Sequence, residues 1–308
     1  MKQLLPLFLI LFSLHLSHAQ DDVVTQDTFW TTGGGIGFDA SSLTLINPKI
    51  GAGVNRIGFG GLGNLFANYK KAKMQWTNVA AVQLGVQRLG PNENPFQKNL
   101  DVLRATSRLG LKSKNEDIYY AAELDLQTIL LTTYTGNLLD GPDEELLAKF
   151  LSPLTLTFAP GIDYKPNERW SFFLSPAAYK MIYVADDEIA ALEVHGNDPG
   201  ENTQINFGAN ARIIFTDKFI DERLTYTSNM SLFSNYLEDP QYVDVLWTNN
   251  ASYLIFKNLS FDVLYEFFYD KDVQVQKDFN KDGFFQEGEI GDGAAHTLAF
   301  VLKYNVIF

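Results

Sequence analysis

The chain of 308 residues contains no cysteine. This absence excludes disulfide bonds, thiolate metal sites, cysteine nucleophiles and a lipid-anchored N-terminal cysteine. Long apolar runs are missing as well, because beyond the N-terminal segment no window approaches the roughly 18 uninterrupted apolar residues of a transmembrane helix. We expect that a mature protein of this kind enters a membrane only as β-strands.

Positive charge is scarce, with 24 Lys and Arg against 37 Asp and Glu, a formal net charge of -13 and a pI of about 4.7. This balance argues against nucleic-acid binding, because phosphates are repelled without a basic stripe. A hydrophobic content of 46% is ordinary for a barrel with a polar lumen. Aromatic residues make up 14% of the chain, which is typical of girdles at two membrane interfaces.

The N-terminal segment has one lysine, an apolar run from Leu4 to Leu16 and the sequence Ser17-His18-Ala19. The run is too short to span a bilayer and ends in small residues, so we expect residues 1–19 to be a secretory signal peptide. Residues 20–28 are then a polar lead, and residues 29–308 form one membrane domain.

The C-terminal stretch alternates between apolar and mostly polar residues and ends on an aromatic side chain. The apolar face holds Leu298, Phe300, Leu302, Tyr304, Val306 and Phe308, and the other face holds Thr297, Ala299, Val301, Lys303 and Asn305. This period of two predicts a strand with one face toward lipid and one toward a lumen. We expect Phe308 and Tyr304 to form the signal that the outer-membrane insertion machinery reads.

Connections between the alternating segments sort into two kinds. Some are tight and often basic, such as 70–73 and 257–258, and these alternate with long acidic or Gly/Pro-rich ones, such as 135–150 and 185–201. Outer-membrane barrels have short periplasmic turns and longer outer loops. The sequence therefore predicts an all-β protein, a transmembrane antiparallel up-and-down β-barrel of about 12 strands. A soluble β-sandwich is the alternative, but its strands are shorter and its loops do not sort in this way.

Several spaced motifs carry a family resemblance: FANYKK at 66–71, WTN at 76–78, QKN at 97–99 followed by Asp101, FAPGIDYKPN at 158–167 and FLSP at 173–176. Together they resemble domain of unknown function 3078, a family of secreted, barrel-like proteins of the Bacteroidota. The resemblance implies an outer-membrane location and supplies no activity. One departure lies at Asn47-Pro48, where the family pattern has an Asn-Trp pair.

Residues 278–289 match the calcium-loop pattern D-x-[DN]-x-[DN]-G-x5-E in full. The pattern predicts a structural Ca2+ site in an outward-facing loop, and the alternative is a solvated acidic hairpin, because strands rather than helices flank the loop. The predicted ligands are Asp278, Asn280, Asp282, the carbonyl of Phe284, Gln286 and Glu289.

Charged residues of both signs share one face of two neighbouring predicted strands. Pairing these strands about the turn near Lys114 sets Arg104 opposite Asp125 and Thr106 opposite Glu123. Arg108, Gln127 and Lys112 lie on the same face. Such a wall either selects charged solutes in a pore or fills a narrow lumen with ion pairs that satisfy one another. The small lumen of about twelve strands favours the second interpretation.

Two motifs suggest other chemistry and lack its context. Residues 58–63 spell G-x-G-x-x-G, but no helix follows to bind a phosphate, so we interpret the glycines as barrel-wall residues. His195 and His296 are the histidines of the mature chain. A lipid hydrolase would need Ser41 or Ser42 to approach His296 from the first strand, and a strand-end histidine is more often an interfacial residue.

We therefore predict a monomeric, non-enzymatic outer-membrane barrel, either a narrow passive channel or a structural surface protein whose outer loop is stabilised by Ca2+. A surface adhesion or binding module is the first alternative, and a lipid hydrolase is the second. The expected partners are outer-membrane lipid and the insertion machinery, and nucleic acid is not among them.

Overall fold

The computed structural model describes residues 29–47, 56–87, 97–139, 144–276 and 289–308. Twelve antiparallel strands form one closed barrel, each neighbouring its sequence neighbour in that barrel, so the predicted architecture and strand number are confirmed. The barrel strands are β1 (Trp30–Ile46), β2 (Arg56–Lys71), β3 (Met74–Gln87), β4 (Gln97–Lys112), β5 (Ile118–Thr128), β8 (Leu154–Asn167), β9 (Trp170–Tyr183), β10 (Thr203–Phe219), β11 (Leu224–Asn235), β12 (Asp244–Phe256), β13 (Leu259–Tyr269) and β16 (Ala295–Ile307).

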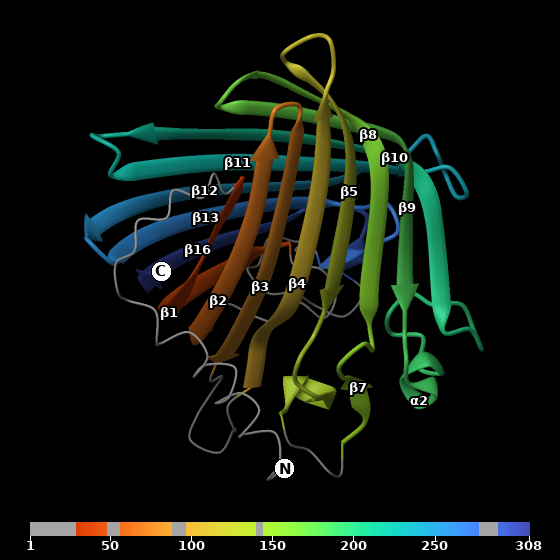
Figure 1. Ribbon diagram of the computed structural model, residues 1–308. Coiled ribbons are helices and arrows are strands. Elements are labelled where there is room, and N and C mark those ends of the chain that lie inside the picture. The colour runs from red at the N-terminus through yellow and green to blue at the C-terminus, as the bar shows by residue number, and fades with distance from the viewer. Residues whose placement is uncertain (1–28, 48–55, 88–96, 140–143, 277–288) are drawn as a thin grey trace, which may run out of the picture.

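The strands are strongly tilted around the ring. In Figure 1, β2, β3, β4, β5, β8 and β9 run upright, whereas β11, β12, β13 and β16 run across behind them. Tilt of this kind accompanies closure of a twisted sheet into a barrel. The two groups of strands therefore form opposite walls.

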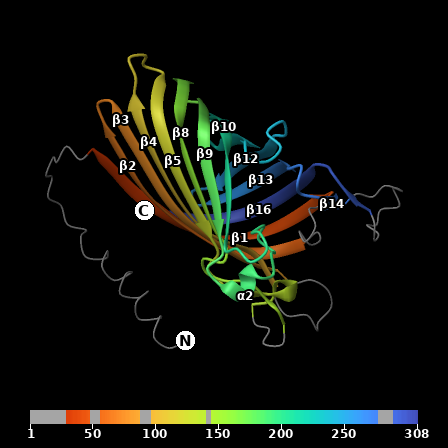
Figure 2. The same cartoon turned by 90° about the vertical axis from the view of Figure 1, so that its right-hand side faces the viewer.

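Short and long connections alternate, as the sequence predicted. Tight turns such as 72–73 and 257–258 lie at one end, and the long connections at the other end carry small elements of their own (Figures 1 and 2). None of the helices in the described part of the chain is long and apolar enough to cross a membrane. The small elements are β6 (Thr133–Tyr134), η1 (Thr135–Asn137), β7 (Leu146–Ala148), α2 (Asp187–Ala190), β14 (Val275–Gln276) and β15 (Ile290–Gly291).

Strands β1 and β16 close the ring. Their register runs from Gly35 opposite Ile307 to Ile46 opposite His296. Beyond it, Phe308 and Gly34 exchange two backbone hydrogen bonds of 3.0 Å. A Cβ atom at Gly34 would lie 2.6 Å from a backbone carbonyl oxygen of β2, so glycine permits this close approach.

The two faces of the barrel differ in chemistry as the period of two predicted. Large apolar side chains are exposed around the outside, while Ala299 and Val301 of the last strand are buried on the inside. The exposed outer residues include Phe38, Phe59, Leu65, Phe158, Ile162, Leu174, Ile205, Phe261, Phe300 and Leu302.

Two tryptophans on the outer face are fixed in the same way near opposite ends of the barrel. Trp76, beside the tight turn after β2, donates from Nε1 to Ser107 Oγ at 2.8 Å. Trp247, beside the long connection before β12, donates to Ser228 Oγ at the same distance. Each tryptophan begins a Trp-Thr-Asn sequence, at 76–78 and 247–249. An indole held at each end is the arrangement expected at two membrane interfaces.

Candidate functional site

The predicted lumen residues of β4 and β5 all face the barrel interior, but their predicted register was wrong by two residues. Arg104 lies opposite Gln127, and Arg108 lies opposite Glu123. The cause is the turn, where Asn115 N donates to Ser113 Oγ at 3.1 Å and so shifts the centre of the hairpin toward β5. The same shift places Thr106, rather than Arg104, directly opposite Asp125.

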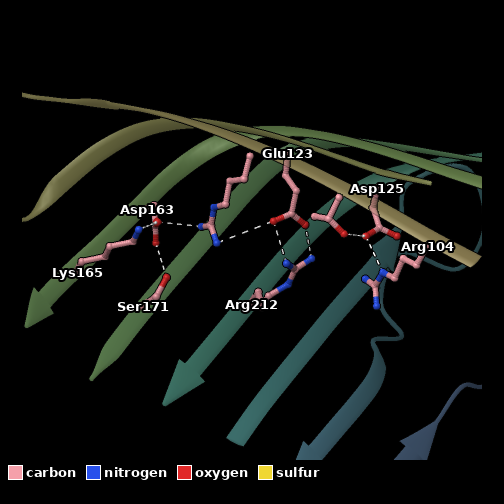
Figure 3. Close-up of polar contacts among 9 residues, drawn as sticks. Arg104, Glu123, Asp125, Asp163, Lys165, Ser171 and Arg212 are labelled. Carbon is pink, nitrogen blue, oxygen red and sulfur yellow. Dashed lines mark hydrogen bonds and ion pairs between the residues drawn. The ribbon is translucent and has the colours of Figure 1, made fainter. Parts of the chain in front are cut away.

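Five charged side chains of alternating sign form a continuous series across the inner wall, which we call the charged ladder (Figure 3). Lys165 Nζ lies 3.2 Å from Asp163 Oδ2, and Arg108 Nη2 lies 2.9 Å from the same oxygen. Arg108 Nη1 is 3.9 Å from Glu123 Oε2, and Arg212 Nη1 donates to that oxygen at 2.8 Å. The second guanidinium nitrogen of Arg212 binds the other carboxylate oxygen of Glu123. The ladder thus joins strands β4, β5, β8 and β10.

A separate pair continues the wall beyond the ladder. Arg104 Nε donates to Asp125 Oδ2 at 2.8 Å, and Thr106 Oγ1 donates to the same oxygen at 2.7 Å. The predicted ion pair between Arg104 and Asp125 therefore forms, although the two residues are diagonal neighbours on the paired strands and do not lie directly opposite each other. The side chain of Arg104 is 49% exposed, whereas that of Asp125 is 15% exposed, so this guanidinium borders the open part of the lumen.

Apolar packing supports the charged ladder from within. The Arg108 guanidinium lies 4.8 Å from the ring centre of Phe173, a cation–π contact. Phe173 is buried against Ala121, Ala159 and Ala178, with Phe233 packed against the cluster. Buried charges cost desolvation energy that pairing and hydrogen bonding offset. This side of the lumen is consequently filled.

The opposite side, formed by β16, β1, β2 and β3, contains a cavity of about 430 Å³. Glycines on the inner face of this wall leave room for neighbouring polar side chains. A Cβ atom at Gly35 would lie 3.0 Å from Asn64 Oδ1, and a Cβ atom at Gly60 would lie 2.6 Å from Asp39 Oδ2. The glycines of 58–63 therefore belong to a strand of the wall, with no helix after them. Residues that line the cavity include Leu62, Asn64, Phe66, Gln83, Lys303 and Asn305.

The histidines and serines weighed for lipid hydrolysis lie apart. His296 accepts or donates one hydrogen bond of 2.9 Å with Tyr265 on the outer face. It pairs with Ile46, whereas Ser42 pairs with Phe300, so Ser42 lies four residues farther along β1, or about 13 Å. The side chain of Ser41 faces the lumen by the same register.

Two of the long connections pack together into a small cap. The Nε2 atom of His195 lies 2.9 Å from the carbonyl oxygen of Leu147, and burial lowers the pKa of this imidazole. Asp186 caps α2 by accepting from Ile189 N at 3.0 Å. Its side chain binds Lys149, and this hydrogen bond is the largest cause that lowers the pKa of the Asp186 carboxyl.

The predicted calcium ligands Asp278, Asn280, Asp282, Phe284 and Gln286 lie outside the described residues, and of the predicted set only Glu289 is described. Within the described ranges, no group of three or more His, Asp or Glu residues is arranged to hold a metal ion. The calcium site therefore stays a prediction from the sequence.

Sequence reasoning missed three of the five residues of the charged ladder. Asp163 and Lys165 come from β8 and Arg212 from β10, and contacts across three strands leave no local signal. A partial signal exists, because Arg212 shares its period-two face with polar Asn206 and Asn210.

Solved structures with similar backbones are barrels of low sequence identity. The NanC porin is 5% identical with a TM-score of 0.40, and the alignment covers 87% of this chain and 98% of that one. An outer membrane channel from Pseudomonas putida F1 is 10% identical with a TM-score of 0.41, covering 90% and 95%. OmpT of Vibrio cholerae is 8% identical with a TM-score of 0.39, covering 90% and 99%. Likeness at this level carries no information about what this chain transports or binds.

No curated protein sequence matches this chain. A family model does match residues 46–134, and its description is "Protein of unknown function (DUF3078)". The matched region contains the motifs at 66–71, 76–78 and 97–101. Over these residues the chain is a match to the DUF3078 family, as its motifs predicted.

Proposed function

We propose that the protein is an outer-membrane β-barrel that acts as a narrow passive channel. Its outer face supports the membrane location, because side chains such as Phe38, Phe59 and Leu65 are each at least 60% exposed. Monomeric soluble proteins rarely expose contiguous apolar surface beyond a few hundred Å². Hydrocarbon around the ring would cover this surface, and the tryptophans Trp76 and Trp247 would lie at its two boundaries.

The observation that carries the channel proposal is the asymmetry of the lumen. The charged ladder and the Phe173 cluster fill one side, while the glycine-rich wall opposite borders a cavity of about 430 Å³. Barrels of about eight strands are filled by side chains and those of about 16 leave an aqueous channel. Twelve strands with one filled side leave a path displaced toward β1, β2, β3 and β16.

Conductance across a planar bilayer tests this path. We expect discrete single-channel steps from the refolded mature protein. Gln83→Trp should lower the conductance severalfold, because Gln83 is exposed on the lumen face of β3 and lines the cavity. The matched control is Ala80→Trp, which adds the same bulk to the exposed outer face of β3 and should leave conductance nearly unchanged.

Each result of that experiment is decisive. A wild-type protein that inserts without current steps would overturn the channel proposal. Equal effects of the two tryptophan variants would overturn the displaced path while leaving a channel in place.

A second function is favoured by the folded cap on the outer loops. Val184, Ile189 and Ala190 are buried there with Leu146 packed against them, so these loops present an ordered surface. A structural or adhesive role through this surface, with the 278–289 loop stabilised by Ca2+, is the alternative. A barrel that is silent in bilayers and binds a surface polymer would favour it.

A further inference from the structure

One row of lumen-facing side chains crosses four strands on the wall opposite the charged ladder. Asn229 lies opposite Thr248, which lies opposite Glu266, which lies opposite Thr297. Neighbours in such a row have Cβ atoms about 4.5–5.5 Å apart. These four residues, which we call the acceptor row, place a carboxylate among hydroxyl and amide groups.

The carboxylate of Glu266 has neither an ion pair nor a hydrogen bond within the described part of the chain. Two amide oxygens near it are also buried without a protein partner, Asn229 Oδ1 in the row and Asn250 Oδ1 in the next row. Asn250 lies opposite Leu264, two residues before Glu266 on the same face. The wall beside Glu266 is therefore rich in acceptors without donors, and of the three groups the half-buried carboxylate is the one that can meet a solute.

Four cations of the inner wall are paired with carboxylates. Arg108 and Lys165 bind Asp163, Arg212 binds Glu123, and Lys303 Nζ lies 2.6 Å from Asp262 Oδ2. Arg104 is paired with Asp125, and Lys180 lies over the Phe233 ring near the charge of Asp244. Lys112 has no ion pair among the described residues, but it lies at the end of β4 beside the tight turn, whereas Glu266 lies near the opposite end of β13. Among the described residues the Glu266 carboxylate therefore has no cation paired with it.

We propose that the acceptor row makes this channel selective for small cations, alkali or primary ammonium ions, with Glu266 as the specificity-determining residue. The proposal rests on the channel function proposed above. A passing cation exchanges part of its hydration shell for the Glu266 carboxylate, which lies between Thr248 and Thr297 on the neighbouring strands. An anion meets the same carboxylate as a repulsive charge, and acidic side chains in a pore select cations in this way.

The reversal potential across a bilayer with a tenfold KCl gradient tests the proposal. The wild-type protein should reverse on the cation-selective side, and Glu266→Gln should lower the K+ to Cl- permeability ratio several-fold. Glu266→Asp should keep most of the selectivity. The matched control is Glu238→Gln, an exposed carboxylate of the connection between β11 and β12 that should leave the ratio unchanged.

Failure of this inference is distinct from failure of the channel proposal. Current steps without cation preference, or a ratio that Glu266→Gln leaves unchanged, would overturn the role of Glu266 while the channel stands. An absence of current from wild type would overturn the channel itself. Heat-modifiable migration in gels checks that each variant has formed a closed barrel.

Discussion

Arg212 on β10 binds both carboxylate oxygens of Glu123 on β5, three strands away around the ring. Glu123 is 4% exposed as a side chain and Arg212 is 17% exposed. The pair spans β8 and β9 from the inside, so it braces a quarter of the barrel wall against the Phe173 cluster.

Arg212→Met should lower the free energy of unfolding by about 3–5 kcal/mol, because it leaves the buried Glu123 carboxylate with only the 3.9 Å contact to Arg108. Urea unfolding of the refolded barrel, followed by tryptophan fluorescence, measures the change. The double variant Glu123→Met/Arg212→Met should lose less than the sum of the single variants, because no charge is then left unpaired.

The control for that experiment is Arg169→Met. Its guanidinium pairs with Asp217 at 3.2 Å, but the side chain is 63% exposed, so the change should stay below about 1 kcal/mol. Additive losses in the double variant would contradict the bracing role of the pair.

Sidedness of the barrel can be measured by labelling, because the chain has no native cysteine. Gln241 lies in the connection before β12 and Lys257 in the tight turn after it, and both are exposed. An impermeant maleimide should label Gln241→Cys in intact cells and Lys257→Cys only after the outer membrane is permeabilised. The reverse pattern would place the tight turns outside and contradict the proposed orientation.

The cap between the long outer connections should loosen in mild acid. Burial lowers the pKa of His195 below its usual 6.5, so the folded cap keeps the ring neutral while the unfolded segment takes up a proton first. The contribution of His195 is therefore complete above pH 6.5 and is lost as the pH falls below it. The protection factors of the backbone amides over 186–197, referred to the intrinsic exchange rate at each pH, should fall below that value.

His195→Gln is the control for the acid effect and should remove the pH dependence in that window. Asp186 acts at lower pH. Its pKa is lowered from 3.8 chiefly by the hydrogen bond from Lys149, so its contribution is present above pH 3.8 and is lost as the pH falls through the lowered value. Unchanged protection factors between pH 7 and 5 in wild type would contradict the assignment to His195.

Calcium should raise the melting temperature of the refolded protein if the loop motif binds it. The expected result is heat release in a calorimetric titration with Ca2+, abolished by Glu289→Gln, which removes the ligand at the last position of the motif. Glu287→Gln removes the same charge at a position that is not a ligand in the pattern and should preserve binding. A titration without heat, together with an unchanged melting temperature in chelator, would remove the site.

Strand number and faces were predictable because both follow from local rules. The period of two assigns each side chain to the outside or the lumen, and tight polar turns mark the hairpins. This reasoning placed Arg104, Arg108, Glu123 and Asp125 on one inner face, as the register has them. The contact of Glu123 with Arg212 was not predictable, because the two residues lie three strands apart around the ring. Strand tilt then decides which residues of such distant strands lie at the same height.

Register was the second limit. Moving the centre of a turn by one residue shifts the partner of every residue in the hairpin by two. The turn at 113–117 is fixed by the side chains of Ser113 and Asn115. Small elements within the outer connections, such as α2 and β7, were also missed. These elements are too short to show a periodic pattern in the sequence, and α2 depends on the N-terminal cap from the Asp186 side chain.

The matched indole anchors of Trp76 and Trp247 have a mechanical consequence. Each ring is held to the adjoining strand by a hydroxyl, so neither can slide along the barrel to follow a shifting water boundary. The distance between the two tryptophans along the barrel therefore sets the membrane thickness that the protein fits. A bilayer of unequal thickness would have to stretch or compress around the protein, and lipid of matching chain length would hold it most firmly.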